Sequence, residues 1–209
     1  MSLITPEFVV IWIGWLMAGG SPGPATLSIS GTAMMRGRQA ALMVALGVLA
    51  GSASWGIAAA LGLSAVMLAN AWIFEVIRYA GAAYLLWLAF KALRGAISPG
   101  AAKTGQAFSG GPRKLFAKGM ALHITNPKAI LSWGAIYAIV APPTAGPVML
   151  FQYFGLLFAG SILIFIGYAI LFSAPPVAQA YARARRWFDL AFAGFFGFAS
   201  LKILTARLG

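Results

Sequence analysis

The residues best suited to bind a small polar molecule interrupt two long apolar segments of the sequence. The first interruption is "SPGP" at Ser21–Pro24, and the second is "TNPKA" at Thr125–Ala129. Proline removes an amide donor and costs about 3 kcal/mol in a helix interior. A helix broken at such a point exposes carbonyls at the end of one half and amides at the start of the next, where charged groups bind. The pattern therefore predicts non-covalent recognition by backbone groups.

Each break also supplies side chains suited to binding. Proline is well accepted at the first position of a helix, and glycine permits close approach to the backbone. A hydroxyl donates or accepts one hydrogen bond readily, and an asparagine amide does both at once. The resulting candidate binding residues are Ser21, Pro22, Gly23, Pro24 and Thr26 at the first break and Thr125, Asn126 and Pro127 at the second.

Lys128 is the charged residue of the second break. An ammonium group near the middle of a membrane is costly unless it faces a cavity or a partner. Lys128 could bind the carboxylate of a ligand. It could instead neutralise the carbonyls of the first break, or extend to the membrane surface. The sequence leaves these roles open.

Three further ionisable residues are candidates for coupling or gating. Glu75 and Arg78 are three residues apart, so their side chains can meet on one helix face. A structural ion pair is the simpler interpretation of that spacing, and gating or proton transfer by Glu75 is the alternative. His123 has an ordinary pKa of about 6.5 and could exchange protons, although a lone histidine is more often a packed, hydrogen-bonded residue.

The composition indicates what must position these residues. The 209-residue chain is 61% hydrophobic and 9% charged, with a mean hydropathy of +0.88. A soluble domain has more charge than this. Each apolar segment has at least 17 residues, enough to cross a hydrocarbon core as a helix, whereas barrel strands are shorter and alternate. We expect an all-α membrane protein with six spans, at about Phe8–Met35, Ala40–Leu68, Ala71–Ala92, Leu115–Ala141, Val148–Ser173 and Phe188–Leu204.

The basic residues predict the orientation of the chain. Eleven of the 15 Lys and Arg residues lie at 36–38, 91–118 and 183–186, in alternate connections between the spans. The positive-inside rule places these connections in the cytoplasm and both termini outside. No basic region precedes the first span, so we expect it to be retained. The net charge of +12 then has anionic lipids as its partner, and no nucleic-acid partner is expected.

The chain divides into two halves of opposite orientation. Residues 1–94 form the first set of three spans, 95–114 a flexible basic cytoplasmic loop, and 115–209 the second set. Three spans per half predict an inverted repeat, and broken helices at matching positions of two halves are typical of a transport site near the midplane. Similar residues in the third and sixth spans support the repeat, although coincidence between apolar segments is an alternative. Two proline kinks that only shape packing are the corresponding alternative for the breaks.

The residue inventory excludes several classes of function. The chain has no cysteine, three acidic residues and one histidine, so we expect neither disulfides nor a metal centre. No arrangement of residues indicates a hydrolase or metalloprotease site. We therefore predict no catalytic residue, no metal and no cofactor. An exporter of another small metabolite or cation, and a membrane scaffold that transports nothing, remain alternatives.

Three blocks of the sequence resemble the LysE/RhtB family of bacterial amino-acid exporters. They are "SPGPATLSISGTAMMRGRQAALMVALGVLAG", "YAGAAYLLWLAFKALRG" and "HITNPKAILSWGA", and the similarity covers nearly the whole chain. The resemblance implies a multi-pass protein of the bacterial inner membrane that exports amino acids or related small metabolites by alternating access, driven by the proton motive force. Helix-start amides would then bind the carboxylate of the amino acid, and helix-end carbonyls its ammonium group. Homo-oligomerisation is left open.

One departure from the family pattern concerns the substrate. Members that export lysine or arginine usually carry an aspartate shortly after the G-x-x-x-G of the second span, whereas Gly51 is followed here by Ser52, Ala53, Ser54 and Trp55. A carboxylate would be the natural partner of a cationic side chain in a low dielectric. The resemblance therefore implies a small neutral substrate of the threonine, homoserine or leucine type. Ser52 and Trp55 are added to the candidate binding residues, with core packing as the simpler role for Trp55.

Overall fold

A computed structural model describes residues 5–69, 71–97, 107–141 and 145–205. Within these residues the chain forms helices only, so the predicted all-α fold is confirmed. The seven helices are α1 (Pro6–Gly20), α2 (Pro24–Ala69), α3 (Ala71–Ile97), α4 (Pro112–Ile124), α5 (Pro127–Val140), α6 (Pro147–Leu171) and α7 (Pro175–Thr205).

Prolines set where most of these helices begin. Six of the seven start with proline, whose fixed φ suits the first helical turn and whose missing amide needs no partner there. Thr5 caps α1 by accepting a hydrogen bond from the Phe8 amide at 3.2 Å, and Asn126 caps α5 in the same manner. The first and fourth apolar segments are therefore each divided into two helices, as predicted, with Ser21–Gly23 and Thr125–Asn126 as the breaks.

Gly37 divides α2 into two parts that correspond to different predicted spans. Its φ of 79° lies in the left-handed region, which favours glycine. Residues 24–36 continue the direction of α1 beyond the break, and residues 38–69 return alongside them. The turn lies between Arg36 and Arg38, where the sequence predicts the first cytoplasmic connection.

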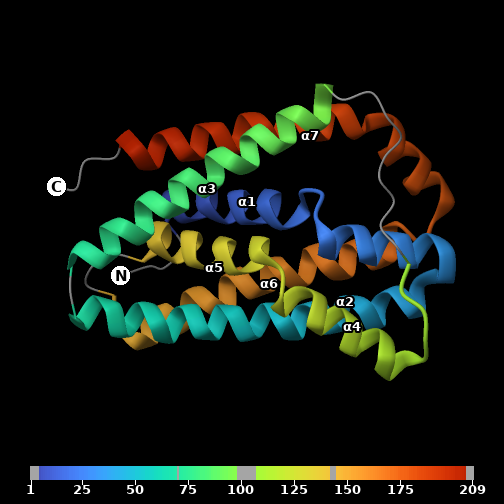
Figure 1. Cartoon of the computed structure of the whole chain (residues 1–209), viewed down its shortest axis with the longest axis horizontal. Helices are drawn as coiled ribbons and strands as arrows, with labels where there is room; N and C mark the ends of the chain where they lie inside the picture. Colours follow the sequence, from blue (N-terminus) through green and yellow to red (C-terminus); the bar gives the residue numbers. More distant parts are fainter. Residues whose placement is uncertain (1–4, 70, 98–106, 142–144, 206–209) are drawn as a thin grey trace.

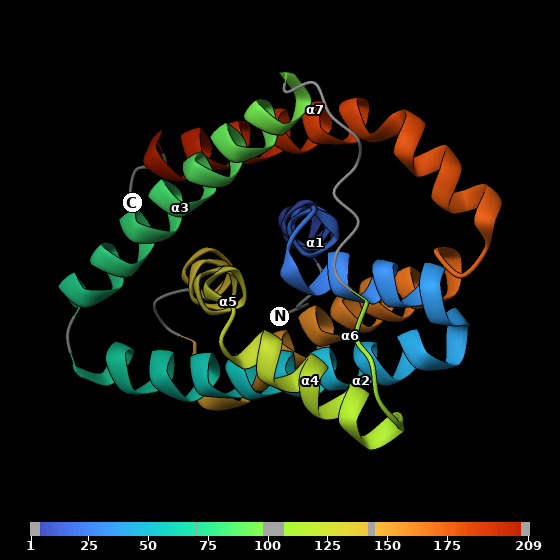
Figure 2. The same ribbon diagram turned by 45° about the vertical axis from the view of Figure 1, so that its right-hand side comes forward.

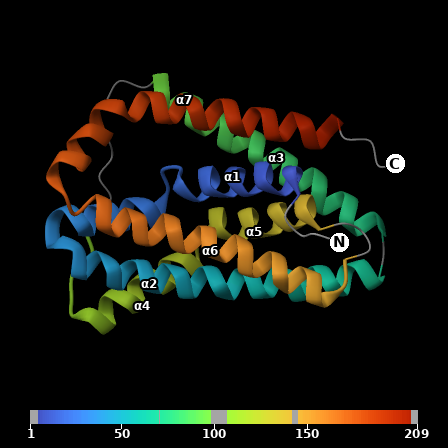
Figure 3. The same cartoon turned by 180° about the vertical axis from the view of Figure 1, so that it is seen from behind.

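The two short apolar helices α1 and α5 occupy the middle of the molecule (Figure 1). Seen from the side in Figure 2, they are enclosed by α3 and α7 on one face and by α2, α4 and α6 on the other. Contacts between α2 and α4, α3 and α7, and α2 and α6 hold the outer helices together. The view from behind in Figure 3 shows α6 running along α2 and α7 covering α3.

The elements are ordered along the long axis in a way that fits the predicted orientation. Figure 1 shows the turn within α2, the end of α3, the start of α4 and the α6–α7 connection toward one end of the molecule. The start of α1 and the end of α7 lie at the other end. We refer to the first of these as the basic end, because the basic connections of the sequence lie there.

Glycines bring α2 and α4 into direct backbone contact. A Cβ atom added at Gly47 would overlap the backbone oxygen of Phe116, and one added at Gly119 would overlap that of Val44. At Gly51 it would lie 3.0 Å from the Cβ of His123. The small residues of the G-x-x-x-G pattern therefore serve close helix packing, and they fix the position of the second break.

By length and composition alone, two helical stretches of the described residues could cross a membrane, namely the 39 residues of Pro24–Gly62, which include the Gly37 turn, and the 25 residues of α6. The apolar helices α1 and α5 are shorter because each is only part of a divided segment. Large apolar side chains point outwards on several helices, including Phe90 on α3, Leu163 on α6 and Phe198 on α7, which are each more than 60% exposed. Such a surface suits lipid rather than water.

Candidate functional site

The end of α1 is completed by side chains that replace the missing helical donors. The Ser21 amide donates to the Met17 carbonyl at 2.9 Å, and the Ser21 hydroxyl donates to the Ala18 carbonyl at 2.8 Å. The Tyr168 hydroxyl of α6 reaches across to the Gly20 carbonyl at 2.6 Å. The carbonyls exposed by the first break are thus bound by groups from within the break and from another helix.

Lys128 links the second break to the first. Its Nζ donates to the Ser21 carbonyl at 2.8 Å and to the Ser21 hydroxyl at 2.6 Å. A cation at this place also offsets the negative end of the α1 dipole. A Cβ atom at Gly23 would lie 3.2 Å from both Cδ and Nζ of Lys128, so glycine leaves room for the lysine chain. Of the contacts considered for Lys128, the structure therefore shows the one with a carbonyl of the first break.

The second break satisfies its own backbone groups. Thr125 donates to the Ala121 carbonyl from its amide and its hydroxyl, and the Trp55 indole donates to the Ile124 carbonyl at 3.1 Å. The Oδ1 of Asn126 accepts a hydrogen bond from the Lys128 amide at 3.1 Å, and the Asn126 carbonyl accepts one from the Ala129 amide at 2.9 Å. The start of α5 is therefore capped within the chain.

The start of α2 is different from the start of α5. Pro24 has no amide hydrogen, and the Thr26 hydroxyl accepts the Gly23 amide at 3.0 Å. The amides of Ala25 and Thr26 belong to the first turn, for which a helix provides no internal acceptor. Ala25 and Thr26 also line the cavity described next. Of the two helix starts predicted to bind an anion, α2 is therefore the better placed.

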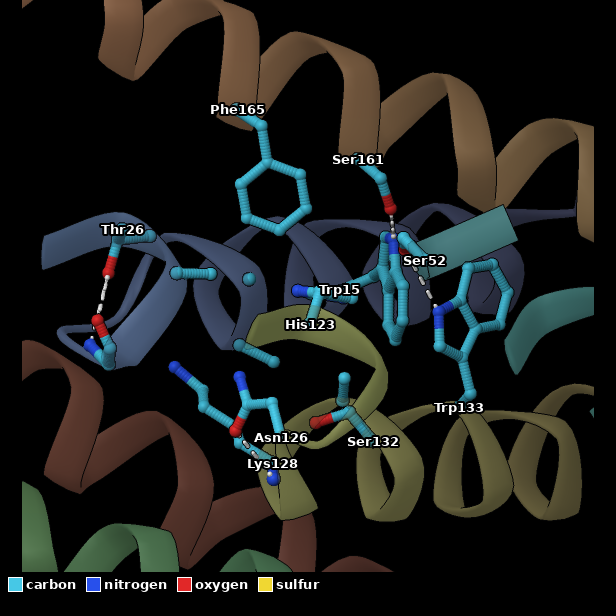
Figure 4. A pocket seen from close by; sticks show the side chains of 15 residues that line it. Trp15, Thr26, Ser52, His123, Asn126, Lys128, Ser132, Trp133, Ser161 and Phe165 are labelled. Carbon is cyan, nitrogen blue, oxygen red and sulfur yellow. Dashed lines mark hydrogen bonds between the residues drawn. The ribbon is translucent and has the colours of Figure 1, made fainter. Parts of the chain in front are cut away.

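A central cavity of about 40 Å³ lies between the two breaks (Figure 4). Helices α1, α2, α4, α5 and α6 contribute to its wall, so both halves of the sequence meet there. None of the described residues that line it is acidic. Its lining consists of Trp15, Ala18, Gly19, Gly23, Ala25, Thr26, Ser52, His123, Asn126, Lys128, Ala129, Ser132, Trp133, Ser161 and Phe165.

Two tryptophans close the central cavity on the side away from Lys128. The rings of Trp15 and Trp133 lie 4.6 Å apart between centroids. Figure 4 shows the two rings next to each other. The Trp15 indole donates to the Leu157 carbonyl at 2.7 Å, and the Trp133 indole donates to the Ser52 hydroxyl at 3.1 Å. Trp133 and Ser52 are each 1% exposed. The indoles are therefore held by α6 and α2 in fixed orientations.

His123 is the remaining ionisable residue of the cavity wall. It is buried, its ring stands edge-on to Phe165 at 5.5 Å, and its Nδ1 has no hydrogen-bond partner among the described residues. A buried ring nitrogen without a partner carries a desolvation cost. His123 thus presents a polar atom that a ligand, a water molecule or a proton would satisfy.

A larger cavity, here called the vestibule, opens toward the basic end. It has a volume of about 500 Å³ and lies between the first break, the end of α3 and the first half of α7. Ser21, Pro22, Gly23 and Pro24 form its inner wall. Its other lining residues are Leu27, Leu88, Lys91, Ala92, Arg94, Gly95, Tyr181, Arg185, Asp189 and Phe196. Gly23 is common to the vestibule and the central cavity, so one residue separates them.

A third cavity of about 320 Å³, here called the apolar cavity, lies beyond the tryptophan pair. It shares Trp15, Ala18 and Ser132 with the central cavity. Its other lining residues come from α1, α3, α5 and α7 and are apolar except for Glu7 near the start of α1. The three cavities therefore form a series along the molecule, interrupted at Ser21–Lys128 and at Trp15–Trp133.

The predicted site residues fall into three groups. Gly23, Thr26, Ser52, Asn126 and Lys128 line the central cavity with His123, whereas Ser21, Pro22 and Pro24 line the vestibule. Thr125, Pro127 and Trp55 line neither cavity, because the second break is self-capped and Trp55 binds its backbone. Glu75 and Arg78 belong to α3, but their side chains lie outside the described residues.

The sequence reasoning did not identify Trp15, Ser132, Ser161 and Phe165 as cavity residues. Serines at 132 and 161 are hydroxyls within otherwise apolar helices, which is a usable signal for an inward face. Trp15 and Phe165 have no such signal, since aromatic residues are also common on lipid-facing surfaces. Their role depends on how α1 and α6 are rotated, which only the packing determines.

Comparison with known proteins gives consistent results over almost the full chain. Residues 11–207 match the model of the LysE type translocator family. The threonine efflux protein of Escherichia coli strain K12 is 32% identical over 205 residues, covering 95% of this chain and 98% of that protein. The threonine efflux protein of Salmonella typhi is 31% identical with the same coverage, and the leucine efflux protein of an Enterobacter species (strain 638) is 33% identical over 56% of this chain and 54% of its own length. No solved structure gives a significant match.

These matches agree with the apolar helices of membrane-spanning length in the described residues. The family model covers both breaks, the vestibule and the central cavity. The resemblance seen in the three sequence blocks is thereby confirmed. The chain belongs to the LysE type translocator family of membrane proteins.

Proposed function

We propose that the protein exports small neutral amino acids of the threonine type from the bacterial cytoplasm. The observation that carries the proposal is the central cavity, which is lined both by Ala25 and Thr26 at the start of α2 and by the cationic Lys128 at the start of α5. Both groups attract a carboxylate. Family membership and the printed names of the relatives, threonine efflux protein and leucine efflux protein, support the same substrate class.

The lining of the central cavity favours a neutral side chain on the substrate. A lysine or arginine substrate would bring a second positive charge beside Lys128 with no carboxylate among the described lining residues. Such a charge would be poorly compensated in a low dielectric. Hydroxyls of Ser52, Ser132 and Ser161 instead suit a short polar side chain such as that of threonine or homoserine.

Transport would proceed by alternating access, with the substrate moving from the vestibule through the central cavity to the apolar cavity. The central cavity of about 40 Å³ holds a few water molecules at most, so it must widen to admit an amino acid. Rocking of residues 1–94 against residues 115–209, as an inverted pair of three-span repeats in the inner membrane, would separate Ser21 from Lys128 on one side and Trp15 from Trp133 on the other.

Proton antiport is proposed as the energy source, and His123 is the candidate carrier. Among the described residues that line the central cavity, only His123 and Lys128 have ionisable side chains, and histidine is the type whose ordinary pKa, about 6.5, lies near neutral pH. His123 lines the central cavity, and its Nδ1 has no hydrogen-bond partner among the described residues. A proton on His123 would repel the substrate ammonium as well as the Lys128 ammonium, so the proton and the amino acid would compete for the cavity, as antiport requires.

The test is efflux of radiolabelled threonine from proteoliposomes that contain the purified protein. Efflux that accelerates under an imposed pH gradient is expected, and a panel of other amino acids defines the substrate range. Efflux that ignores both the pH gradient and the voltage would contradict proton coupling. Transport of a cation or another metabolite, but of no neutral amino acid, would favour the alternative exporter. Transport of nothing would favour the membrane scaffold.

A further inference from the structure

The vestibule carries charges of both signs on one wall. Lys91 and Arg94 of α3 and Arg185 and Asp189 of α7 all line it, which gives three positive charges and one negative, a net charge of +2. Its volume of about 500 Å³ is in the range of small-molecule sites, whereas that of the central cavity is not. The vestibule is therefore large enough for an amino acid without any movement of the helices.

Asp189 is held in an unusual environment for a carboxylate. The residue is only 4% exposed, and its Oδ2 has no hydrogen-bond partner among the described residues. The nearest cation, Nε of Arg185, lies 3.4 Å away as an ion-pair contact. A buried carboxylate oxygen that accepts no hydrogen bond is costly. Asp189 thus offers an acceptor that a cationic donor entering the vestibule would satisfy.

Gly95 provides the space in which this carboxylate lies. A Cβ atom at Gly95 would lie 3.1 Å from Oδ2 and 3.5 Å from the carboxyl carbon of Asp189. The carboxylate therefore packs directly against the α3 backbone, one residue after Arg94 and one helical turn after Lys91. The carboxylate of α7 is in this way brought beside the stretch of α3 that carries Lys91 and Arg94, where the Lys91 Nζ lies 5.0 Å from the centroid of the Trp87 ring.

We propose that the vestibule is a loading site for α-amino acids, in which Asp189 binds the α-ammonium group and Lys91 and Arg94 bind the carboxylate. The inference rests on the proposed function and adds a second site to it. An amino acid carries its two charges a few ångströms apart, so a wall with both signs recognises it better than a wall of one sign. The net charge of +2 also draws the carboxylate in from the cytoplasm.

The loading site is continuous with the central cavity. Ser21 lines the vestibule and accepts a hydrogen bond from the Lys128 ammonium. Gly23 lines both the vestibule and the central cavity. A carboxylate that leaves Lys91 and Arg94 therefore next meets Lys128 when Ser21 and Lys128 separate. The basic residues form a sequence of carboxylate partners from the vestibule into the centre of the molecule.

The test uses everted membrane vesicles, in which the cytoplasmic face is outside and the threonine concentration at the vestibule can be set. Initial uptake rates are measured against concentration for the native protein, Asp189→Asn, Lys91→Gln and Arg183→Gln. Arg183 is exposed on the same helix and does not line the vestibule, so it controls for general charge effects. Asp189→Asn is expected to raise the apparent KM at least tenfold and Lys91→Gln several-fold, with maximal rates within twofold and Arg183→Gln unchanged. An unchanged KM for Asp189→Asn would overturn the loading site.

Two further measurements separate the other outcomes. If Asp189→Asn does not fold, Gly95→Ala leaves the carboxylate in place but crowds it, and a several-fold higher KM is expected. The 2-hydroxy acid analogue of threonine lacks the ammonium group and is expected to compete at least tenfold less well than an amino acid of equal size. Equal competition would overturn the role of Asp189. Native vesicles that accumulate no amino acid at all would contradict the proposed function itself.

Discussion

The Nζ of Lys128 lies 2.8 Å from the carbonyl and 2.6 Å from the hydroxyl of Ser21. One residue follows the second helix break and the other follows the end of α1, although they are 107 positions apart in the sequence. The contact therefore joins the two halves of the chain where the vestibule meets the central cavity. It places a cation on the path that a substrate would take.

Replacement of Lys128 is expected to abolish transport. Lys128→Met keeps much of the length and apolar volume but leaves the Ser21 carbonyl without its donor and the cavity without its cation. Because hydrogen bonds to charged groups contribute about 1.5–3 kcal/mol, efflux of threonine should fall at least tenfold. Ser21→Ala removes one of two contacts and should lower efflux less. The measurement is the initial rate of efflux from proteoliposomes.

Lys118 provides the matched control for that substitution. It lies on α4, where its Nζ binds the Ser109 carbonyl at the surface and away from the three cavities. Lys118→Met should leave efflux within twofold of the native rate. Equal loss of efflux in the Lys118 and Lys128 variants would show that net charge, and not the bridge between the breaks, controls transport.

Introduction of a carboxylate at position 52 is expected to change the substrate preference. Ser52→Asp places a negative charge in the wall of the central cavity. There it would pair with the cationic side chain of a lysine substrate and would not repel the α-ammonium group of the substrate. Efflux of lysine should appear while efflux of threonine falls. Ser52→Asn is the uncharged control and should give no lysine efflux. Competition between labelled lysine and threonine measures the preference, and no gain with lysine would contradict a cavity selective by charge.

Close packing of α2 on α4 is expected to be sensitive to a single methyl group. Gly47→Ala forces a Cβ against the Phe116 backbone, which cannot rotate away. The free energy of unfolding should fall by about 2 kcal/mol or more, seen as a lower midpoint of thermal denaturation in detergent. Gly155→Ala on α6 has no atom within 4 Å and should leave the midpoint unchanged or raise it. Equal midpoints for the two variants would argue against glycine-mediated contact.

Replacement of His123 separates coupling from binding. His123→Gln keeps a hydrogen-bonding side chain of similar size but cannot carry a proton, so stimulation of efflux by an imposed pH gradient should be lost. Exchange of internal for external threonine, which needs no net proton movement, should continue at a measurable rate. A variant whose efflux still responds fully to the gradient would exclude His123 as the carrier.

The helices and their breaks could be predicted from the sequence because local chemistry determines them. Prolines at 24 and 127 cannot continue a helix, and Gly37 permits the left-handed turn, so these boundaries follow from single residues. The spacing of Gly47 and Gly51 is typical of a close helix contact, but it does not identify α4 as the partner. The inverted repeat and the orientation of the chain stay predictions.

The central site could be predicted only in part, because it depends on which groups accept hydrogen bonds from the first amides of each helix. From the sequence, Pro24 and Pro127 were equivalent starts of half-helices. In the structure the side chain and the carbonyl of Asn126 accept hydrogen bonds from the Lys128 and Ala129 amides at the start of α5. Ala25 and Thr26 at the start of α2 instead line the cavity. The position of the Lys128 ammonium also depends on α1 and α5 lying side by side, and no local sequence pattern predicts that arrangement.

The measurement that tests the central claim most directly is protection of a single thiol by substrate. The native chain has no cysteine, so Ser132→Cys places the only thiol in the wall of the central cavity. Its reaction with a small methanethiosulfonate reagent is followed in proteoliposomes with and without saturating threonine, beside Ser54→Cys on the outer face of α2. If an amino acid binds between the two broken helices, threonine slows labelling at position 132 at least several-fold and leaves position 54 unaffected. Equal labelling of position 132 with and without threonine, in a variant that still transports it, would contradict the account.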